Sequence, residues 1–354
     1  MDRLLAWYGE ENYARQLARA RRFWAGEGRC VVSVQSSHQA YRQTFKPEEI
    51  LRRAPENLRH QATLPGLNLP SFFPDFGTVS TARYWGGRAR FDSTGANIFV
   101  DPVAADLDQA LSLAPLPPDH PRQDAALGLR LYRTVCEQLE TDRLWLRTPD
   151  FQGPLNTAGL VLRQEEMLVA MHEAPEKLHA FLARVCDFLI SYQRHLCHAA
   201  QGRVCGNIWP YTFLPCDLGA ALTEDLMPLL SPMQYQEFGI PYLRRIEQAL
   251  GPLHVHCCGQ FGRHAANLKK AGLKLRALEF HHPFTTIEQL ECLSSETVFI
   301  PYIALDKQDR FKTSREYYWR LLKETPAQFR YWFALMDDSA ENLELARELW
   351  SEAT

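Results

Sequence analysis

Apolar and polar positions follow two periods along the chain, one typical of helices and one typical of strands. Residues 3–25 place apolar side chains three and four positions apart among charged ones, which predicts an amphipathic helix. Short apolar runs rich in strand-forming residues then recur, beginning with Val31, Val32 and Val34. The later runs are 70–76, 143–150, 203–210, 251–258, 275–280, 298–304 and 329–335.

These eight runs, each followed by a helical pattern, predict an α/β fold. Alternation of strand and helix favours a parallel sheet, and eight such units favour a closed (β/α)8 barrel, the TIM-barrel architecture. Residues 77–142 are less regular, and we interpret them as an excursion after the second strand that folds over the barrel mouth. We therefore predict one domain over 1–354, with 1–28 as an N-terminal helical extension.

Composition narrows the class of protein. The 354 residues are 46% hydrophobic and 23% charged, which is ordinary for a folded protein with a sizeable core. A formal net charge of -3 provides no basic field for nucleic acid. The nine cysteines are an odd number and no signal-peptide or membrane-length apolar run is visible, so we expect a cytoplasmic protein with free thiols and no membrane partner.

The stretch "LHVHCCGQFG" at 253–262 is the most informative motif, because it ends the fifth predicted strand. Side chains alternate along a strand, so His256 and Cys258 share one face, roughly 6.6 Å apart. They are close enough for an imidazole and a thiolate to bind one metal ion. His254 is about 13 Å from Cys258 and too deep to join them. The alternative is a core histidine beside small buried cysteines. At the active face of a barrel we favour the metal.

Several motifs, taken in order, resemble one family. "HVHCCGQ" is similar to the His-x-Cys-Gly signature that ends strand five in the uroporphyrinogen decarboxylase (URO-D) superfamily, and in particular in its zinc-dependent corrinoid:thiol methyltransferases. The segments 229–250, "LLSPMQYQEFGIPYLRRIEQAL", and 151–162, "FQGPLNTAGLVL", resemble a helix and a loop of that superfamily, as does "APEKLHAFLARVCDFLISYQ". The resemblance runs from about 144 to the C-terminus.

The resemblance implies a (β/α)8 barrel, often dimeric, with the ligand site in its mouth. In the methyltransferase branch, His256 and Cys258 would hold zinc together with a cysteine after strand eight. This chain has Asp337 and Asp338 there, so we expect Asp337, or else Asp338, as the third ligand. An oxygen ligand hardens the site and weakens the case for zinc. Either aspartate could instead cap the final helix.

The decarboxylase branch of the same superfamily is the alternative. Its members grip substrate carboxylates with an arginine-rich segment and carry a catalytic aspartate after strand two. Here only Arg42 remains of the first feature, and Asp75 matches the second, although an aspartate before a glycine is also ordinary turn chemistry. Decarboxylation of a tetrapyrrole is therefore the second hypothesis.

Further candidates surround the predicted mouth. Glu279, after strand six, is a candidate ligand or base, and Asp217 is a second catalytic candidate. Trp209 and Tyr211, with Gln152, are candidates for a ligand pocket, although the aromatic residues could equally seal the core. Weaker candidates are Cys216, His281, His282, Arg83, Arg88 and Arg90.

The sequence thus predicts a metal-dependent methyltransferase that moves a methyl group between a methylated corrinoid and a thiol. The expected cofactor is zinc, and the expected partners are a small thiol or tetrapyrrole, a corrinoid protein and a second copy of the chain. A non-catalytic corrinoid or metal binder is the third hypothesis.

Overall fold

The computed structural model describes residues 2–36, 45–93, 97–207, 209, 211–294 and 296–352. The chain begins with two helices, α1 (Arg3–Tyr8) and α2 (Glu10–Trp24), in place of the one predicted over 3–25. Gly9 separates them because its backbone has φ 72, a left-handed conformation that ends a helix.

Each of the eight predicted apolar runs contains a strand. These strands are β1 (Cys30–Val34), β2 (Ser71–Phe72), β5 (Trp145–Arg147), β6 (Val204–Gly206), β9 (Leu253–Cys257), β10 (Leu275–His282), β11 (Val298–Ile303) and β12 (Arg330–Leu335). The sequence reading missed two short strands, β7 (Leu214–Pro215) and β8 (Ala220–Thr223), and the hairpin formed by β3 (Ala89–Phe91) and β4 (Ile98–Val100).

The strands form two main sheets. The larger is six-stranded and parallel, in the order β1-β12-β11-β10-β9-β8, and the other has the order β2-β5-β6-β7. The closed eight-stranded barrel is therefore not confirmed, because the described strands form no closed sheet. The strand expected at 203–210 corresponds to β6, which pairs with β5, whereas the missed strand β8 is the neighbour of β9.

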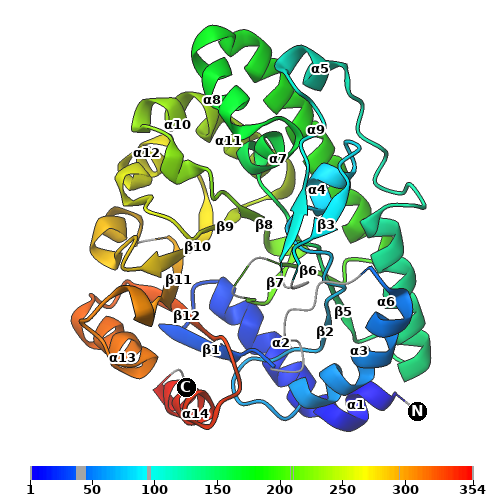
Figure 1. The fold of residues 1–354 in the computed structure, drawn as a ribbon. Coiled ribbons are helices and arrows are strands. Elements are labelled where there is room, and N and C mark those ends of the chain that lie inside the picture. The colour runs from blue at the N-terminus through cyan, green and yellow to red at the C-terminus, as the bar shows by residue number, and fades with distance from the viewer. Residues whose placement is uncertain are drawn as a thin grey trace.

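Helices surround the strands on the outside (Figure 1). They are α3 (Pro47–Gln61), α4 (Ser80–Arg83), α5 (Leu107–Ser112), α6 (Asp124–Leu139), α7 (Pro154–Val161), α8 (Gln164–Glu173), α9 (Pro175–Ala199), α10 (Pro232–Phe238), α11 (Ile240–Leu250), α12 (Ala265–Ala271), α13 (Ser314–Glu324) and α14 (Ala340–Glu352). The predicted excursion at 77–142 thus contains α4, the β3–β4 hairpin, α5 and α6. Among the described residues, no helix combines the length and apolar character that crossing a membrane requires.

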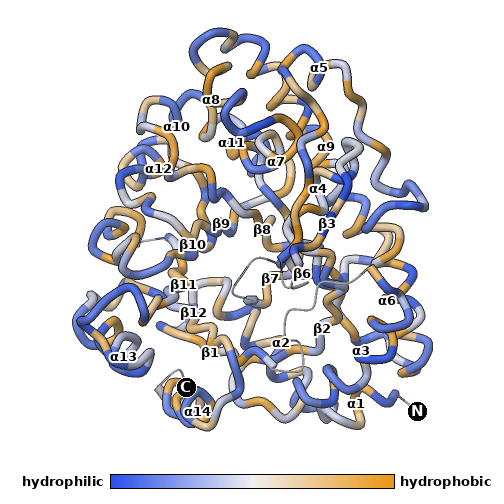
Figure 2. The backbone as a smooth tube through the Cα atoms, in the orientation of Figure 1, coloured by the Kyte–Doolittle hydropathy of each residue, from blue (hydrophilic) through white to orange (hydrophobic). Residues whose placement is uncertain are grey.

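An inner apolar core lies between the two sheets. It combines Val31 and Trp332 of the larger sheet with Trp145 of the other. The end of α2 closes this core, because the Trp24 ring stacks on Trp332 at 5.2 Å between centroids. Apolar segments accordingly run through the strands, and hydrophilic ones lie mostly toward the outside (Figure 2). Polar residues, among them Asp225 and Cys258, follow the carboxyl ends of two of these strands.

Candidate metal centre and its surroundings

Three neighbouring parallel strands bring the candidate site together at their carboxyl ends. Thr223 of β8 is in register with His256 of β9, and His256 is in register with Glu279 of β10. Segments that leave β8 and β9 therefore emerge side by side. Asp225 lies just beyond the end of β8, and Cys258 directly follows β9.

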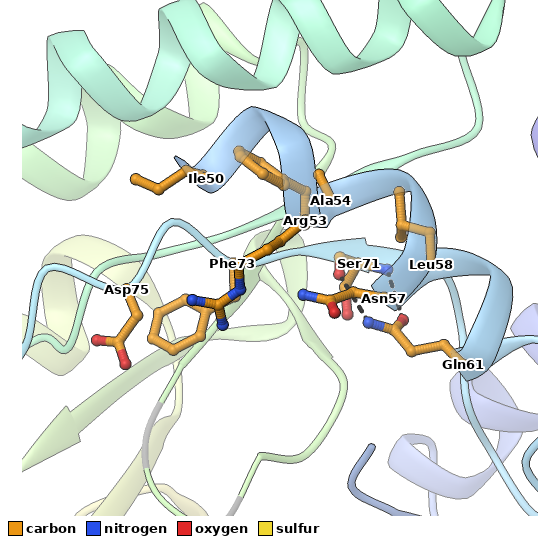
Figure 3. A pocket seen from close by; sticks show the side chains of 10 residues that line it. Ile50, Arg53, Ala54, Asn57, Leu58, Gln61, Ser71, Phe73 and Asp75 are labelled. Atoms are coloured by element: carbon orange, nitrogen blue, oxygen red, sulfur yellow. Dashed lines mark hydrogen bonds between the residues drawn. The ribbon is translucent and has the colours of Figure 1, made fainter. Parts of the chain in front are cut away.

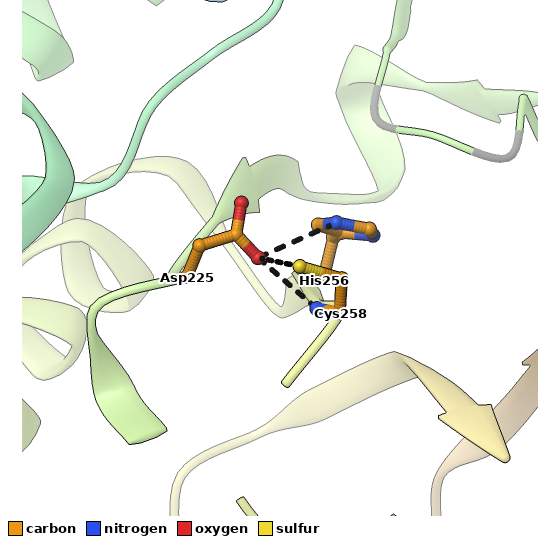
Figure 4. Close-up of side chains that lie close together, drawn as sticks. All are labelled: Asp225, His256 and Cys258. Carbon is orange, nitrogen blue, oxygen red and sulfur yellow. Dashed lines mark hydrogen bonds and ion pairs between the residues drawn. The ribbon is translucent and has the colours of Figure 1, made fainter. Parts of the chain in front are cut away.

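Asp225, His256 and Cys258 form a cluster that could hold a metal ion (Figure 4). The Asp225 carboxylate oxygen Oδ1 lies 3.1 Å from the Cys258 sulfur and 3.5 Å from His256 Nε2. One ligand atom from each residue lies within 4.8 Å of the others. The structure thus brings His256 and Cys258 together, and it adds Asp225, which the sequence reading did not select.

Gly259 allows the two loops of this cluster to approach each other. A side chain at this position would place its Cβ only 2.5 Å from Pro228 Cγ, closer than real contacts allow. Pro228 belongs to the loop that follows Asp225, so glycine after Cys258 lets that loop pack against the end of β9. The glycine of the His-x-Cys-Gly signature therefore has a packing role here.

Groups around Cys258 shift the pKa of its thiol in opposite directions. The hydrogen bond with His256 lowers the pKa of the Cys258 thiol, whereas burial and the Asp225 carboxylate raise it, and the pKa ends above its ordinary value. A cation between these groups would reverse the effect of the carboxylate, because metal ligation requires the thiolate.

Glu279 contacts two histidines inside the sheet. Its carboxylate is fully buried and lies 2.5 Å from His256 Nδ1 and 2.9 Å from His281 Nε2. Burial raises the pKa of Glu279, but the two imidazoles lower it by more. Burial lowers the pKa of His256, but Glu279 raises it well above its ordinary value. His256, Glu279 and His281 also satisfy the geometry of a second candidate metal cluster.

His256 uses its two ring nitrogens on different partners. Its Nε2 faces Asp225 and its Nδ1 faces Glu279. A histidine that binds a metal through one nitrogen commonly donates the other N–H to a carboxylate, which fixes the ring. Glu279 is therefore placed to orient His256 toward the cluster with Cys258. Its role as ligand or base stays a prediction, and it belongs to the second candidate metal cluster.

Gln152 holds a second carboxylate beside the cluster. Its side-chain amide donates to Asp150 Oδ1 at 2.6 Å, and its backbone pairs with Thr223 of β8. Burial raises the pKa of Asp150 to about 6, against the opposing effect of His256. The predicted ligand-pocket residue Gln152 thus supports Asp150, a half-buried acid that the sequence reading missed.

Trp209, an aromatic candidate for the ligand pocket, lies beside the histidines of the site. Its ring centroid is 5.1 Å from that of His281, 4.7 Å from that of Tyr302 and 6.3 Å from that of His256. The indole therefore forms an aromatic wall over the histidines. His282, by contrast, stacks on Tyr317 on the other side of β10 at 4.9 Å.

Asp217 and Tyr211 lie elsewhere. Asp217 forms an exposed ion pair with Arg21 of α2 at 2.9 Å. It precedes β8, whereas Asp225 follows it, so the two aspartates lie at opposite ends of this strand. Tyr211 packs against Phe73 with ring centroids 5.1 Å apart, next to a cavity described below.

Asp337 and Asp338 belong to neither metal cluster among the described residues. Asp337 Oδ1 accepts the backbone N–H of Ser339 at 3.0 Å and the side-chain amide of Asn342 at 2.8 Å, at the start of α14. Asp338 forms an ion pair with His60. Asp337 thus has a local role of the kind that the capping alternative describes, whereas Asp338 contacts His60 of α3.

Asp75, which the decarboxylase hypothesis singles out, lines a separate cavity of about 50 Å³, between α3 and the segment that includes β2 (Figure 3). Arg53, Asn57 and Asp75 line it. Burial raises the pKa of Asp75 to about 6, although the Gly77 N–H and the Arg53 charge oppose this. Arg42 falls in 37–44, outside the described residues.

Two of the weaker arginine candidates, Arg83 and Arg90, form ion pairs with acids outside the two clusters. Arg83 forms an ion pair with Asp124 of α6, and Arg90 pairs with Asp101 at 2.9 Å across the β3–β4 hairpin. These contacts are those of ordinary surface and packing residues.

The fold resembles that of a known methyltransferase. A methyltransferase from Methanosarcina mazei superposes with a TM-score of 0.67 at 12% sequence identity, covering 96% of this chain and 98% of that one. A Listeria monocytogenes protein described as a vitamin-B12-independent methionine synthase gives a TM-score of 0.46 at 11% identity over 86% of both chains. No protein-family model matches the sequence. No curated protein matches it either.

Proposed function

We propose that this protein is a zinc-dependent methyltransferase that transfers a methyl group from a methylated corrinoid to a thiol. The observation that carries the proposal is the convergence of Asp225, His256 and Cys258 at the carboxyl ends of two adjacent parallel strands. The fold similarity to a methyltransferase and the sequence resemblance are compatible with it. We place Asp225, in place of Asp337, as the third ligand.

The residues of the cluster fit a catalytic zinc. Sulfur, nitrogen and oxygen from three residues match the ligand types of catalytic zinc sites, which leave a fourth position for substrate. Cys258 is exposed, so a substrate can reach the cluster from the outside. The buried Glu279 carboxylate supports His256 from behind, as in zinc sites in which a carboxylate holds the ligating imidazole.

The remaining residues would prepare the reactants. Zinc, when bound, would supply a Lewis acid that keeps a thiol in its thiolate form at neutral pH. Asp150, the half-buried acid held by Gln152, is placed to accept the proton that the thiol loses. Trp209 and Tyr302 would present flat apolar surface to the methyl donor. The sulfur–carbon bond then forms as the cobalt–carbon bond breaks and leaves its electron pair on the corrinoid.

We also propose that the two sheets are adjacent arcs of one (β/α)8 barrel. At one boundary Gln152 bridges to Thr223 of β8, and at the other the Leu67 N–H donates to the Val32 carbonyl of β1 at 2.8 Å. The shared inner core supports this arrangement. The cluster would then lie in the barrel mouth, where such enzymes place their active sites. A corrinoid protein and a second copy of the chain remain proposed partners.

The test is zinc analysis of protein purified without added metal. We expect about one zinc per chain, a sharp loss in Cys258→Ala, and no loss in the matched variant Cys292→Ala, whose cysteine is also exposed. Demethylation of methylcobalamin by 2-mercaptoethanol should likewise be lost in Cys258→Ala and kept in Cys292→Ala. Zinc retained in Cys258→Ala would contradict the proposal. Release of carbon dioxide from a porphyrinogen by metal-free protein would favour the decarboxylase, and cobalamin binding without methyl loss would favour the non-catalytic binder.

A further inference from the structure

Arg147 is a buried cation at the end of β5. Only 9% of its surface is exposed, and it lines a cavity of about 30 Å³ together with residues of β1, β2 and the segment 211–213. Its Nε donates to Ser71 Oγ at 2.8 Å, and one terminal nitrogen donates to the Thr212 carbonyl at 3.0 Å. The Tyr211 ring lies 5.5 Å from its guanidinium carbon. The guanidinium is therefore held in place by neutral groups.

Among the described residues, no carboxylate forms an ion pair with Arg147. It differs in this from Arg83, Arg244 and Arg320, each of which faces an acid. The segment 37–44, "SHQAYRQT", which lies outside the described residues, contains neither aspartate nor glutamate. A buried charge without a partner costs several kcal/mol, so such a group usually meets a counter-charge.

The other polar side chains that line the cavity already have partners. Gln61 exchanges hydrogen bonds with the backbone of Ser71. Asn68 accepts the Val34 N–H of β1 and donates to the Pro65 carbonyl of its own loop, and Ser33 Oγ accepts from the Trp332 indole at 2.8 Å. Arg147 is thus the group of this cavity whose charge is not compensated within the described residues.

We propose that Arg147 anchors the carboxylate of a small-molecule ligand. Two nitrogens of the Arg147 guanidinium already donate to protein groups, so its remaining N–H groups match one monoanionic carboxylate. A phosphate group would call for more cations or a nest of backbone N–H groups. The cavity is adjacent to the larger one that Arg53 and Asp75 line, because Gln61 and Ser71 line both. This inference goes beyond the proposed methyl transfer and does not require the metal.

The experiment measures binding of propionate, its neutral analogue propionamide and inorganic phosphate by ligand-observed NMR, on full-length protein treated with a chelator. We expect saturable binding of propionate and at least about tenfold weaker binding of propionamide and phosphate. Arg147→Gln should weaken propionate binding at least about tenfold, and Arg147→Lys, which keeps the charge but loses the fork, should lie between the two.

Arg276→Gln is the matched control. Arg276 is also partly buried and donates to a backbone carbonyl, that of Trp24, at 2.8 Å, but it lies near the start of β10. The same change there should leave propionate binding unaltered. Equal binding of propionate and propionamide, tighter phosphate binding, absence of propionate binding, or unchanged propionate affinity in a folded Arg147→Gln variant would each overturn the proposal. Because the protein is metal-free, failure of the zinc hypothesis would not produce any of these results.

Discussion

Asp225 touches Cys258 twice. Its carboxylate oxygen Oδ1 accepts the backbone N–H of Cys258 at 3.0 Å and lies 3.1 Å from the sulfur of the same residue. The backbone hydrogen bond fixes the carboxylate where the sulfur and His256 meet. An acid held in this way beside a thiol disfavours the thiolate unless a cation joins them.

Changing Asp225 to asparagine should therefore weaken metal binding while keeping the fold. The amide oxygen can still accept the Cys258 N–H, but the negative ligand is lost, and we expect zinc affinity to fall about tenfold or more. Competition with a chromophoric chelator measures this affinity. Asp217→Asn, at the other end of β8, is the matched control and should bind zinc as the wild type does. An unchanged affinity in Asp225→Asn would show that Asp225 is not a ligand.

Glu279→Gln should separate positioning from ligation. Glutamine keeps the shape but removes the charge that holds His256 Nδ1, so we expect zinc affinity to fall about 10-fold to 100-fold. Zinc should still bind at the same stoichiometry, because the three ligands remain. The pH dependence of zinc binding should also shift to lower pH, because without Glu279 the His256 imidazole loses its proton more easily and protons compete less with the metal. Glu288→Gln, which alters a surface ion pair with Arg320, should change neither quantity.

Asp75 makes stability depend on pH. Its pKa is raised from 3.8 to about 6 by burial, so the folded state holds a proton that the unfolded chain releases. Below about pH 3.8 the Asp75 carboxyl is protonated in both states and does not destabilise the fold. As pH rises from about 3.8 to about 6, the free energy of unfolding falls by at most about 3 kcal/mol. Asp75→Asn should gain stability relative to wild type over this range. Urea unfolding at several pH values measures it, with the exposed Asp119→Asn as control; parallel curves for Asp75→Asn and wild type would refute the assignment.

The sequence predicted the eight main strands and two of the three residues of the cluster. Apolar runs located eight strands because burial imposes a continuous apolar pattern, and alternation along β9 placed His256 and Cys258 on one side. It missed Asp225 because β8 is only four residues long and follows the more conspicuous run at 203–210, which forms β6 in the other sheet. Recognising "AALT" before Glu224 and Asp225 as a strand would have supplied the missing acid.

The expected third ligand shows a different limit of sequence reasoning. Asp337 occupies the end of β12, where the resemblance implied a ligand, but position at a strand end does not fix the direction of a side chain. Its carboxylate instead satisfies N–H groups at the start of α14, which would otherwise lack acceptors. A competing local hydrogen bond of this kind cannot be weighed from the sequence alone.

The stacking of Trp24 on Trp332 bears on where the protein can be shortened. Because α2 ends with Phe23 and Trp24 inserted among the inner aromatic residues, the first helices are an internal component of the fold and no detachable extension. Deleting them would remove the two rings that pack on the Trp332 indole. A truncation through α2 would therefore open the inner core between the two sheets.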